Sequence, residues 1–505
     1  MPEHRPPAGL FGPGPGGEQV TVYADAFADA SYEGDLMALA GCAYRTGRES
    51  QLEHGEPSAG RVFVRPVADP PTPEAARAGE LHDRLRLRPF PGYAEVLDAP
   101  GTGDGDHRVQ GYNLRMMITD DPGNQLPVRR PVDYDRDRIA ALEHPGLMEN
   151  LMPNRKMRVN RPQLVGEHIG YAEGSWAERQ RIIDAHWRAL QGCLHFLRTD
   201  PAVAGETRRR WQAWGLAADE FADNGNRPYE IYARETRRLD GRYRFTAHDA
   251  MLAPGLERAP VHSTAVAATE WYIDSHACSF ERYGDSRHEG KVILHMETFP
   301  GMVPYEALLP RELDNLLVVN CVSSTHVGWN TIRLEPTWMN IGEAAGWALA
   351  LARDAGVAPA DVDRQHLVRT LARTGVMVSF CNDVDVASRE AWVAAVQYFG
   401  TRGFFAGYDV RPDDPLGRRT AEVWLQAAAR VGSPDYEPMR TVHAVHDLAA
   451  DTDEPIDRAA LETLLARSPL AGKPGARVLR APERVTRADF CRLLFALTAP
   501  TRAAG

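Results

Sequence analysis

Cysteine is scarce in this sequence, and none of its cysteines forms a C-x-x-C pair. The six are scattered over 505 residues: Cys42, Cys193, Cys278, Cys321, Cys381 and Cys491. Zinc sites and redox dithiols usually bring two cysteines within a few residues of each other, so the pattern indicates neither, and no metal site is predicted. We expect six buried free thiols.

Long apolar runs and excess positive charge are also missing. No stretch reaches the roughly 18 apolar residues of a membrane-spanning helix, and the first residues, MPEHRPPAGLFGPGPGGEQ, lack the layout of a signal peptide. The formal charge is -11 and the isoelectric point is about 5.9, which argues against nucleic acid and anionic membrane surfaces as partners. We therefore expect a cytoplasmic protein.

The segment from Asn315 to Gly356 is the most informative part of the chain. It begins with a short apolar run, Leu316 to Val319, which is typical of a strand buried on both faces. A polar loop follows, and a helix is predicted from Pro336 to Gly356, because proline favours a first helical position and glycine follows a last one.

The predicted helix has one face with small side chains. Gly342, Ala345, Gly346 and Leu349 fall at helical spacing, so another backbone or a flat ligand is able to approach closely. The loop before the helix carries Ser323, Ser324, Thr325 and His326, and the N-terminus of a helix favours an anion or an electron-rich ring edge. Tight packing of a helix on a sheet explains the same pattern.

The residues SSTHVGWNTIRLEPTWMNIGEAAGWALALA resemble the C-terminal flavin-contacting segment of a family of bacterial FAD-dependent oxidoreductases. Five further segments match that family in the family's order: DASYEGDLMALAGCAYRTGRE from Asp29, VQGYNLRMMITDDPGN from Val109, DEFADNGNRPYEIYARETRRLDG from Asp219, YIDSH from Tyr272 and VPYEALLPRELDNLLVVN from Val303. Together they cover most of residues 20 to 356.

The resemblance implies FAD as cofactor and a small organic molecule as substrate. It places these residues at the cofactor: Asp29, Gly34, Asp35, Ser324, Thr325, His326, Arg333, Glu335, Gly342, Ala345 and Gly346. Asp35 is equally explained as a cap of a helix that begins at Leu36. The fold implied is mixed α/β, with a partial FAD-binding Rossmann-like domain, an inserted β-rich substrate domain and a C-terminal helical appendage.

One family feature is absent from this sequence. Such enzymes begin with a G-x-G-x-x-G strand-turn-helix that holds the pyrophosphate, whereas the glycines between Gly9 and Gly17 are interleaved with prolines and follow no apolar strand. Three explanations stay open: the true start lies upstream of Met1, a separate subunit supplies this half, or the domain was lost and FAD is no longer used in the usual way.

Candidate catalytic residues lie in the middle of the chain. His276, in the segment from Trp271 to His276, is our candidate for the general base of a flavin dehydrogenase, although a structural histidine bonded to Asp274 explains it equally. Tyr272 and Arg234 are candidates for orienting the substrate. Arg234 belongs to a cluster that either clamps an anionic substrate or pairs with the surplus carboxylates: Arg234, Arg237, Arg238, Arg242 and Arg244.

The predicted organisation has four parts. They are a loop or disordered segment at 1–18, a partial FAD-binding domain at 19–45 and 291–358, a substrate domain at 46–290, and a helical region at 359–505. In the last part, Trp392 to Ala429 resembles an S-layer-homology-type module, and VTRADFCRLLFAL, Val485 to Leu497, looks like a second copy of its final helix.

Shorter elements are predicted as well. Val20 to Ala28 alternates as a strand, Gly111 to Asn124 predicts a strand entering a turn, Trp176 to Leu197 predicts a helix, and Ile231 to Phe245 predicts an amphipathic element.

Two function classes remain. The first is an FAD-dependent oxidoreductase that transfers a hydride from substrate to flavin. The second is a flavin-free relative that acts as a binding or structural subunit. A homo-oligomer and a partner chain carrying the dinucleotide-binding half are both compatible with the sequence.

Overall fold

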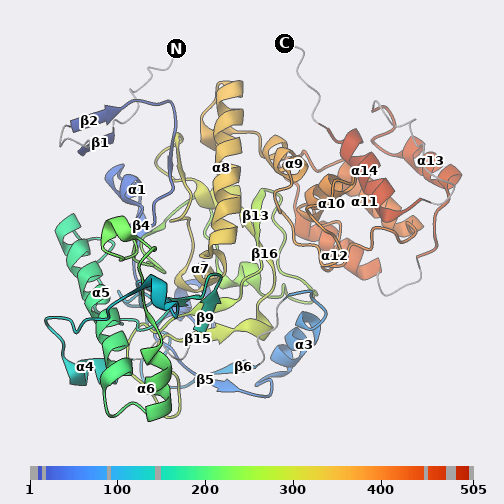
Figure 1. The fold of residues 1–505 in the computed structure, drawn as a ribbon. Coiled ribbons are helices and arrows are strands. Elements are labelled where there is room, and N and C mark those ends of the chain that lie inside the picture. The colour runs from blue at the N-terminus through green and yellow to red at the C-terminus, as the bar shows by residue number, and fades with distance from the viewer. Residues whose placement is uncertain are drawn as a thin grey trace. The chain divides into compact units, whose positions relative to one another are not determined.

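The computed structural model describes residues 10–13, 19–87, 92–142, 149–448, 453–473 and 485–499, which form a mixed α/β protein with C-terminal helices (Figure 1). Its two compact units are each built from several chain segments. The first holds Met1–Gly105, Arg237–Ser275 and Val292–Gly505, and the second holds Asp106–Thr236 and His276–Lys291. The second unit contains fewer residues than the predicted substrate domain at 46–290.

A parallel strand pair organises the first unit. Strand β17 (Leu316–Val318) pairs with β3 (Phe27–Asp29) in the register Leu316 to Phe27, and all three β17 residues are buried. The prediction of a doubly buried strand after Asn315 is confirmed. Parallel pairing joins two segments that lie almost 290 residues apart along the chain.

The predicted strand from Val20 to Ala28 is wrong, because the chain bends near Asp25 and forms two strands. The first, β2 (Gln19–Val22), pairs with β1 (Leu10–Pro13) in an antiparallel hairpin, and the second is β3. Strand β2 pairs with β1, whereas β3 pairs with β17. The alternation of apolar residues does not reveal which strand a segment pairs with. Residues 10–13 are therefore a strand rather than a loop, and 1–9 and 14–18 lie outside the described residues.

Two helices follow β17, where the sequence predicted a loop and one helix. Helix α7 (His326–Ile332) is buried along its whole length, and α8 (Glu335–Ala355) runs vertically in Figure 1. Gly356 ends α8 in the left-handed conformation at φ 68°, as a C-terminal glycine should. The prediction of α8 is confirmed to within one residue, but α7 was missed.

Small antiparallel pairs complete the strands of the first unit. They are β4 (Tyr44–Arg45) with β12 (Arg238–Leu239), β5 (Phe63–Val67) with β6 (Tyr93–Leu97), β13 (Ala265–Thr269) with β16 (Gly301–Pro304), and β14 (Ile273–Ser275) with β15 (Val292–Leu294). The amphipathic element predicted for Ile231 to Phe245 is wrong, since β12 is the only strand there and no helix forms in that described segment.

The first unit also has short helices near its N-terminus. They are α1 (Asp35–Leu39), α2 (Gln51–His54) and α3 (Pro73–His82).

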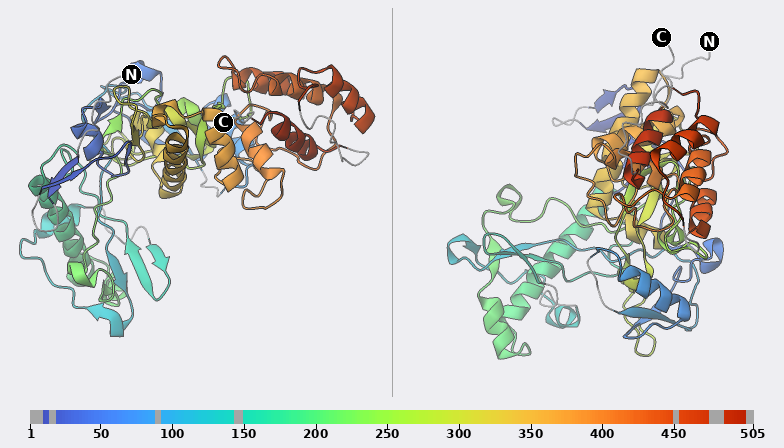
Figure 2. Two further views of the ribbon diagram at one scale, coloured as in Figure 1. Left: turned by 90° about the horizontal axis from the view of Figure 1, so that it is seen from above. Right: turned by 90° about the vertical axis from the view of Figure 1, so that its right-hand side faces the viewer.

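The C-terminal helices gather at one end of the first unit, in orange to red in Figures 1 and 2. They are α9 (Arg364–Thr374), α10 (Val393–Gly400), α11 (Arg418–Ala428), α12 (Pro438–Leu448), α13 (Arg458–Arg467) and α14 (Arg487–Leu497). One hydrophobic core runs from β17 and α8 through α9 into these helices.

Three of these helices begin in the same way. Leu416, Ile456 and Val485 are buried and stand shortly before α11, α13 and α14, and their backbones bond to one another: Leu416 N–H donates to Val485 O and Ile456 N–H donates to Leu416 O, both at 2.9 Å. The sequence predicts α14 as a copy of α11, whereas α13 was not predicted.

The second unit is an antiparallel sheet with helices. Its strand order is β8 (Gln125–Leu126), β11 (Gly215–Ala217), β7 (Met117–Thr119), β10 (Lys156–Val159) and β9 (Glu149–Met152), and its helices are α4 (Arg136–Ala141), α5 (Trp176–Thr199) and α6 (Gly205–Gln212). A Ser175–Glu178 capping box starts α5, which confirms the predicted helix.

Two expectations from the composition are compared with the structure: the state of the cysteines and the presence of a membrane-spanning helix. All six cysteines are buried and free, as expected. Over the described residues, no helix combines the length and the apolarity that crossing a membrane requires.

Candidate functional site

The segment from Ser323 to His326 lies inside the first unit rather than on its surface. Ser324, Thr325 and His326 are each no more than 3% exposed. Thr325 caps α7, since its Oγ1 accepts from Gly328 N–H at 3.0 Å. The loop between β17 and α7 therefore has a structural role, because its Thr325 caps α7.

A buried carboxylate occupies the start of α7. Glu49 Oε2 accepts from the backbone N–H of His326 at 2.8 Å, and Glu49 Oε1 pairs with Arg238 Nη2 at the same distance. Burial opposes the negative charge, but Arg238 and the His326 N–H outweigh it and lower the pKa of Glu49 to about 2. The helix start that was predicted to favour a bound anion therefore holds an anion of the protein itself.

A second buried glutamate completes this network. Glu56 Oε1 accepts from Thr325 Oγ1 at 2.8 Å and from Ala247 N–H at 2.6 Å, while burial raises the pKa of its carboxyl group. His326 Nε2 lies 3.4 Å from Ser275 Oγ. The Ser324 hydroxyl is buried and has no hydrogen-bond partner among the described residues, so it is the polar atom of this loop that a ligand would satisfy.

Arg333 and Glu335 differ sharply in environment. Arg333 is 2% exposed and its Nη2 donates to Asp274 O at 2.9 Å and to Asp274 Oδ2 at 3.2 Å. Glu335 is exposed at the first position of α8. Asp274, which the sequence offered as a structural partner of His276, accepts from Arg333.

The small-residue face of α8 is partly open. A Cβ on Gly346 would meet no atom within 4 Å, and one on Gly342 would meet only Val319 Cγ1, at 3.8 Å. Ala345 is buried, so the open strip lies along Gly342 and Gly346. Gly346 is exposed and Gly342 is half-buried, so the strip is reached from solvent.

The turn at Asp29 is closed by the protein's own hydrogen bonds. The Asp29 carboxylate accepts from Ser31 N–H at 3.0 Å, from Ser31 Oγ at 2.6 Å and from Met37 N–H at 2.9 Å. Gly34 is left-handed at φ 66°, and a Cβ there would lie 3.0 Å from Cys321 Sγ, so the close approach is to the protein. Asp35 is the first residue of α1 and also pairs with Arg237 at 2.8 Å.

Four of the five arginines in the cluster pair with carboxylates. Arg237 pairs with Asp35, Arg238 with Glu49, Arg242 with Asp314 and Arg244 with Asp240. Of the two alternatives that the sequence left open, the structure shows pairing with the protein's own acids. No member of these four pairs is set apart for an anionic substrate.

His276 and Arg234 lie in the second unit. His276 is 7% exposed, its backbone N–H donates to Gln110 Oε1 at 3.1 Å, and its Nδ1 lies 2.7 Å from the Gln163 side-chain amide. Arg234 Nη1 donates to Gly111 O at 2.5 Å. Gln163 and Gln110 were not singled out in the sequence, and no local pattern marks them.

Tyr272 belongs to the first unit, as do the residues of the α7 and α8 region. Its ring stacks on Trp271 with centroids 4.6 Å apart, and His295 meets it edge-on at 5.0 Å. The predicted catalytic residues are therefore divided between the units, with Tyr272 in one and with His276 and Arg234 in the other.

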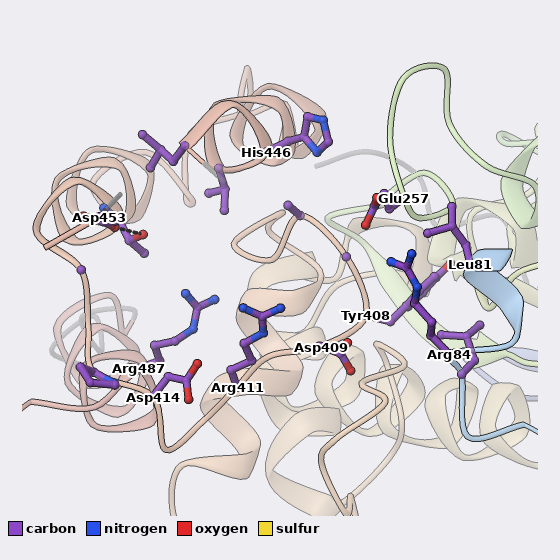
Figure 3. Close-up of a pocket in the computed structure, with 18 of the residues that line it drawn as sticks. Leu81, Arg84, Glu257, Tyr408, Asp409, Arg411, Asp414, His446, Asp453 and Arg487 are labelled. Carbon is purple, nitrogen blue, oxygen red and sulfur yellow. Dashed lines mark hydrogen bonds between the residues drawn. The ribbon is translucent and has the colours of Figure 1, made fainter. Parts of the chain in front are cut away.

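A cavity of about 480 Å³ in the first unit contains none of the predicted residues (Figure 3). Arg411 and Arg487 extend side by side from its wall, with Asp414 beside them. Its charged lining residues are three arginines, Arg84, Arg411 and Arg487, and four acids, Glu257, Asp409, Asp414 and Asp453. The two signs nearly balance, so the lining selects neither anions nor cations.

Comparison with known proteins identifies the larger part of the chain. The profile described as FAD dependent oxidoreductase matches residues 14–371, which is more than half of the sequence. The chain belongs to the FAD-dependent oxidoreductase family. Neither the curated proteins nor the solved structures contain a match.

The FAD-dependent oxidoreductase match contains every predicted site residue, from Asp29 to Gly346. It ends within α9, so the helices from α10 to α14 lie outside it. The cavity of Figure 3 draws most of its charged residues from that C-terminal region.

Proposed function

We propose that this protein is an oxidoreductase that transfers a hydride from a small organic substrate to FAD. Family membership over residues 14–371 is the observation that carries the proposal. When bound, the flavin supplies the redox chemistry, and the protein orients the substrate and handles the proton.

Two features of the first unit fit a flavin. The open strip at Gly342 and Gly346 on α8 accommodates a flat ring, and the unpartnered hydroxyl of buried Ser324 offers a hydrogen bond. Around them we place Thr325, His326, Arg333, Glu335 and Ala345, with the turn at Asp29, Gly34 and Asp35 as the adenosine side. The Glu49–Arg238 pair would fix the loop that carries Ser324.

His276 is our candidate for the base. In the dehydrogenation proposed, the substrate carbon would give a hydride to the flavin, the atom bonded to that carbon would give a proton to the imidazole, and the electron pair left on that atom would form the new double bond. Tyr272 would orient the substrate through its half-buried ring. Arg234 is tied to backbone and amide oxygens, so its contribution would come through the residues that it holds.

The G-x-G-x-x-G spacing occurs in these 505 residues at Gly12, Gly14 and Gly17, but there it is interleaved with prolines, and we do not assign the FAD pyrophosphate to it. We propose that residues outside this sequence hold the FAD pyrophosphate, either encoded upstream in the same gene or carried by a partner chain. Reading the DNA upstream of Met1, and then the neighbouring genes, for an in-frame G-x-G-x-x-G decides between these sources.

A flavin-free binding or structural subunit is the second candidate. The observation that favours it is that Glu49 of the protein itself accepts from the His326 N–H at the start of α7, so a bound anion is not required there. In this reading α8 and β17 keep their packing but have lost the redox role.

An absorbance spectrum of the purified chain, with and without added FAD, tests the proposal. We expect the two visible bands of oxidised flavin to shift and sharpen when the protein binds it, and the His326→Ala variant to change that spectrum. A chain that leaves the FAD spectrum unchanged, both alone and together with a G-x-G-x-x-G-bearing partner, would favour the flavin-free subunit.

A further inference from the structure

The Gln163 side chain sits among three hydrogen-bond donors in the second unit. With the amide oxygen facing them, Gln163 Oε1 accepts from Arg161 Nη1 at 2.5 Å, from His276 Nδ1 at 2.7 Å and from Arg234 Nη2 at 3.1 Å. A guanidinium group has donors and no acceptor. Two arginines therefore determine which end of the amide points toward His276.

The orientation of Gln163 determines the state of the His276 ring. An amide oxygen is able only to accept, so Nδ1 of His276 must carry the hydrogen, and in the neutral ring the basic lone pair then lies on Nε2. We propose that Gln163 is a positioning residue that sets the Nδ1–H tautomer of His276 and directs Nε2 as the proton-accepting atom. This assignment rests on the proposed role of His276 as the base.

Burial and further bonds hold this arrangement in place. Gln163, Arg234 and His276 are 4%, 2% and 7% exposed, so water does not compete freely for these bonds. Arg234 is anchored by Gly111 O, and the backbone of His276 by Gln110 Oε1 at 3.1 Å. The ring is fixed through its own backbone on one side and through Gln163 on the other.

Two arginines converge on one neutral oxygen, which is an unusual use of charge. Each also has other acceptors: Arg234 Nη2 lies 3.4 Å from the side-chain oxygens of Asn113 and Asn160, and Arg161 Nη1 lies 3.4 Å from Asn160 O. All of these acceptors are neutral.

Ring nitrogen signals in ¹⁵N-histidine-labelled whole chain test the proposal without a substrate or flavin. The His276 signals are assigned by their loss in His276→Gln. We expect Nδ1 of the wild-type protein to be the protonated nitrogen and Nε2 the unprotonated one. In Gln163→Leu, which lacks the acceptor, we expect the hydrogen to move to Nε2.

Gln163→Glu is the matched control, because it keeps an acceptor in the same place. We expect the Nδ1–H form to persist in this variant, because a carboxylate oxygen accepts from Nδ1 as the amide oxygen does. The wild-type and Glu variants suffice if Gln163→Leu does not fold, as judged by circular dichroism.

Two results would overturn the assignment. One is an Nε2–H ring in the wild-type protein, and the other is an unchanged Nδ1–H ring in folded Gln163→Leu. Failure of the base role looks different: the Nδ1–H ring would be present, but His276→Ala would still reduce its bound flavin with substrate.

Discussion

At the scale of single residues, the Glu49–Arg238 pair decides how the α7 junction is built. Arg238 is fully buried and Glu49 is 2% exposed, and Arg238 also donates to Ser324 O at 3.1 Å and to Gly47 O at 2.6 Å. The sequence identified Arg238 as one of a cluster, but its partner lies 189 residues away. Side-chain pairing over that separation is invisible to local patterns.

Replacing Arg238 by Met should strongly destabilise the first unit. Breaking a buried ion pair leaves an uncompensated charge, and we expect a loss of about 3–5 kcal/mol in the free energy of unfolding. The matched control is Arg242→Met, whose partner Asp314 is exposed and whose loss should cost less than about 1 kcal/mol. Urea unfolding measures both, and equal losses would contradict the prediction.

The Glu49–Arg238 pair should make the free energy of unfolding fall at acid pH. The pKa of Glu49 is about 2 in the folded protein against 4.5 for a free carboxyl, so its contribution is complete above pH 4.5 and is lost as the pH falls through about 2. In Arg238→Met the pKa of Glu49 should shift up from about 2, so we expect a smaller loss of stability between pH 4.5 and pH 2. Urea midpoints measured across that range would show the shift, and parallel curves would contradict it.

At the scale of elements, local signals located the ends of helices well. Pro336 and Gly356 mark the ends of α8 correctly, because capping depends on neighbouring residues, and apolar spacing placed α5 from Trp176. Helix α7 was missed because it is short and buried on all sides, so it has no polar face to give a helical period. Helix α13 became recognisable only through the backbone bonds of Ile456.

Substitutions at Gly346 separate folding from ligand binding on α8. A Cβ at Gly346 meets nothing within 4 Å, so Gly346→Ala should stabilise the helix by about 0.5–1 kcal/mol. Gly346→Phe fills the open strip and should abolish the FAD-induced spectral change while the chain stays folded.

The control for Gly346→Phe is Asp354→Phe, on an exposed site near the end of the same helix. It adds the same ring away from the strip and should leave FAD binding intact. Thermal melts and FAD titrations measure both effects. Normal FAD binding by Gly346→Phe would remove this strip from the cofactor site.

At the scale of the whole molecule, each unit has a hydrophobic core of its own. One core joins β17 and α8 to the C-terminal helices, and another gathers residues of α5 around the five-stranded sheet. The sequence predicted an inserted domain, but it set the limits at 46–290, whereas the second unit starts at Asp106 and takes up the chain again at His276. Its second segment is short, and no change in composition marks its ends.

A substitution in one hydrophobic core should lower the protection from hydrogen exchange mainly in the unit that contains that core. Leu190→Ala in α5 and Leu371→Ala in α9 each remove a fully buried side chain and should cost about 2–5 kcal/mol. We expect hydrogen–deuterium exchange to rise in the second unit for Leu190→Ala and in the first for Leu371→Ala. Equal loss of protection in both units for either variant would contradict separate cores.

The sequence by itself determined the family, the buried β17 strand, the long helices and the buried thiols, because these depend on residue order and on short-range spacing. Tertiary structure alone decided that Glu49 occupies the start of α7, that carboxylates take up the arginines from Arg237 to Arg244, and that Gln163 faces His276. Hydrogen bonds and ion pairs act only over a few ångströms, so their partners are chosen when distant segments pack together, and spacing along the chain does not reveal them.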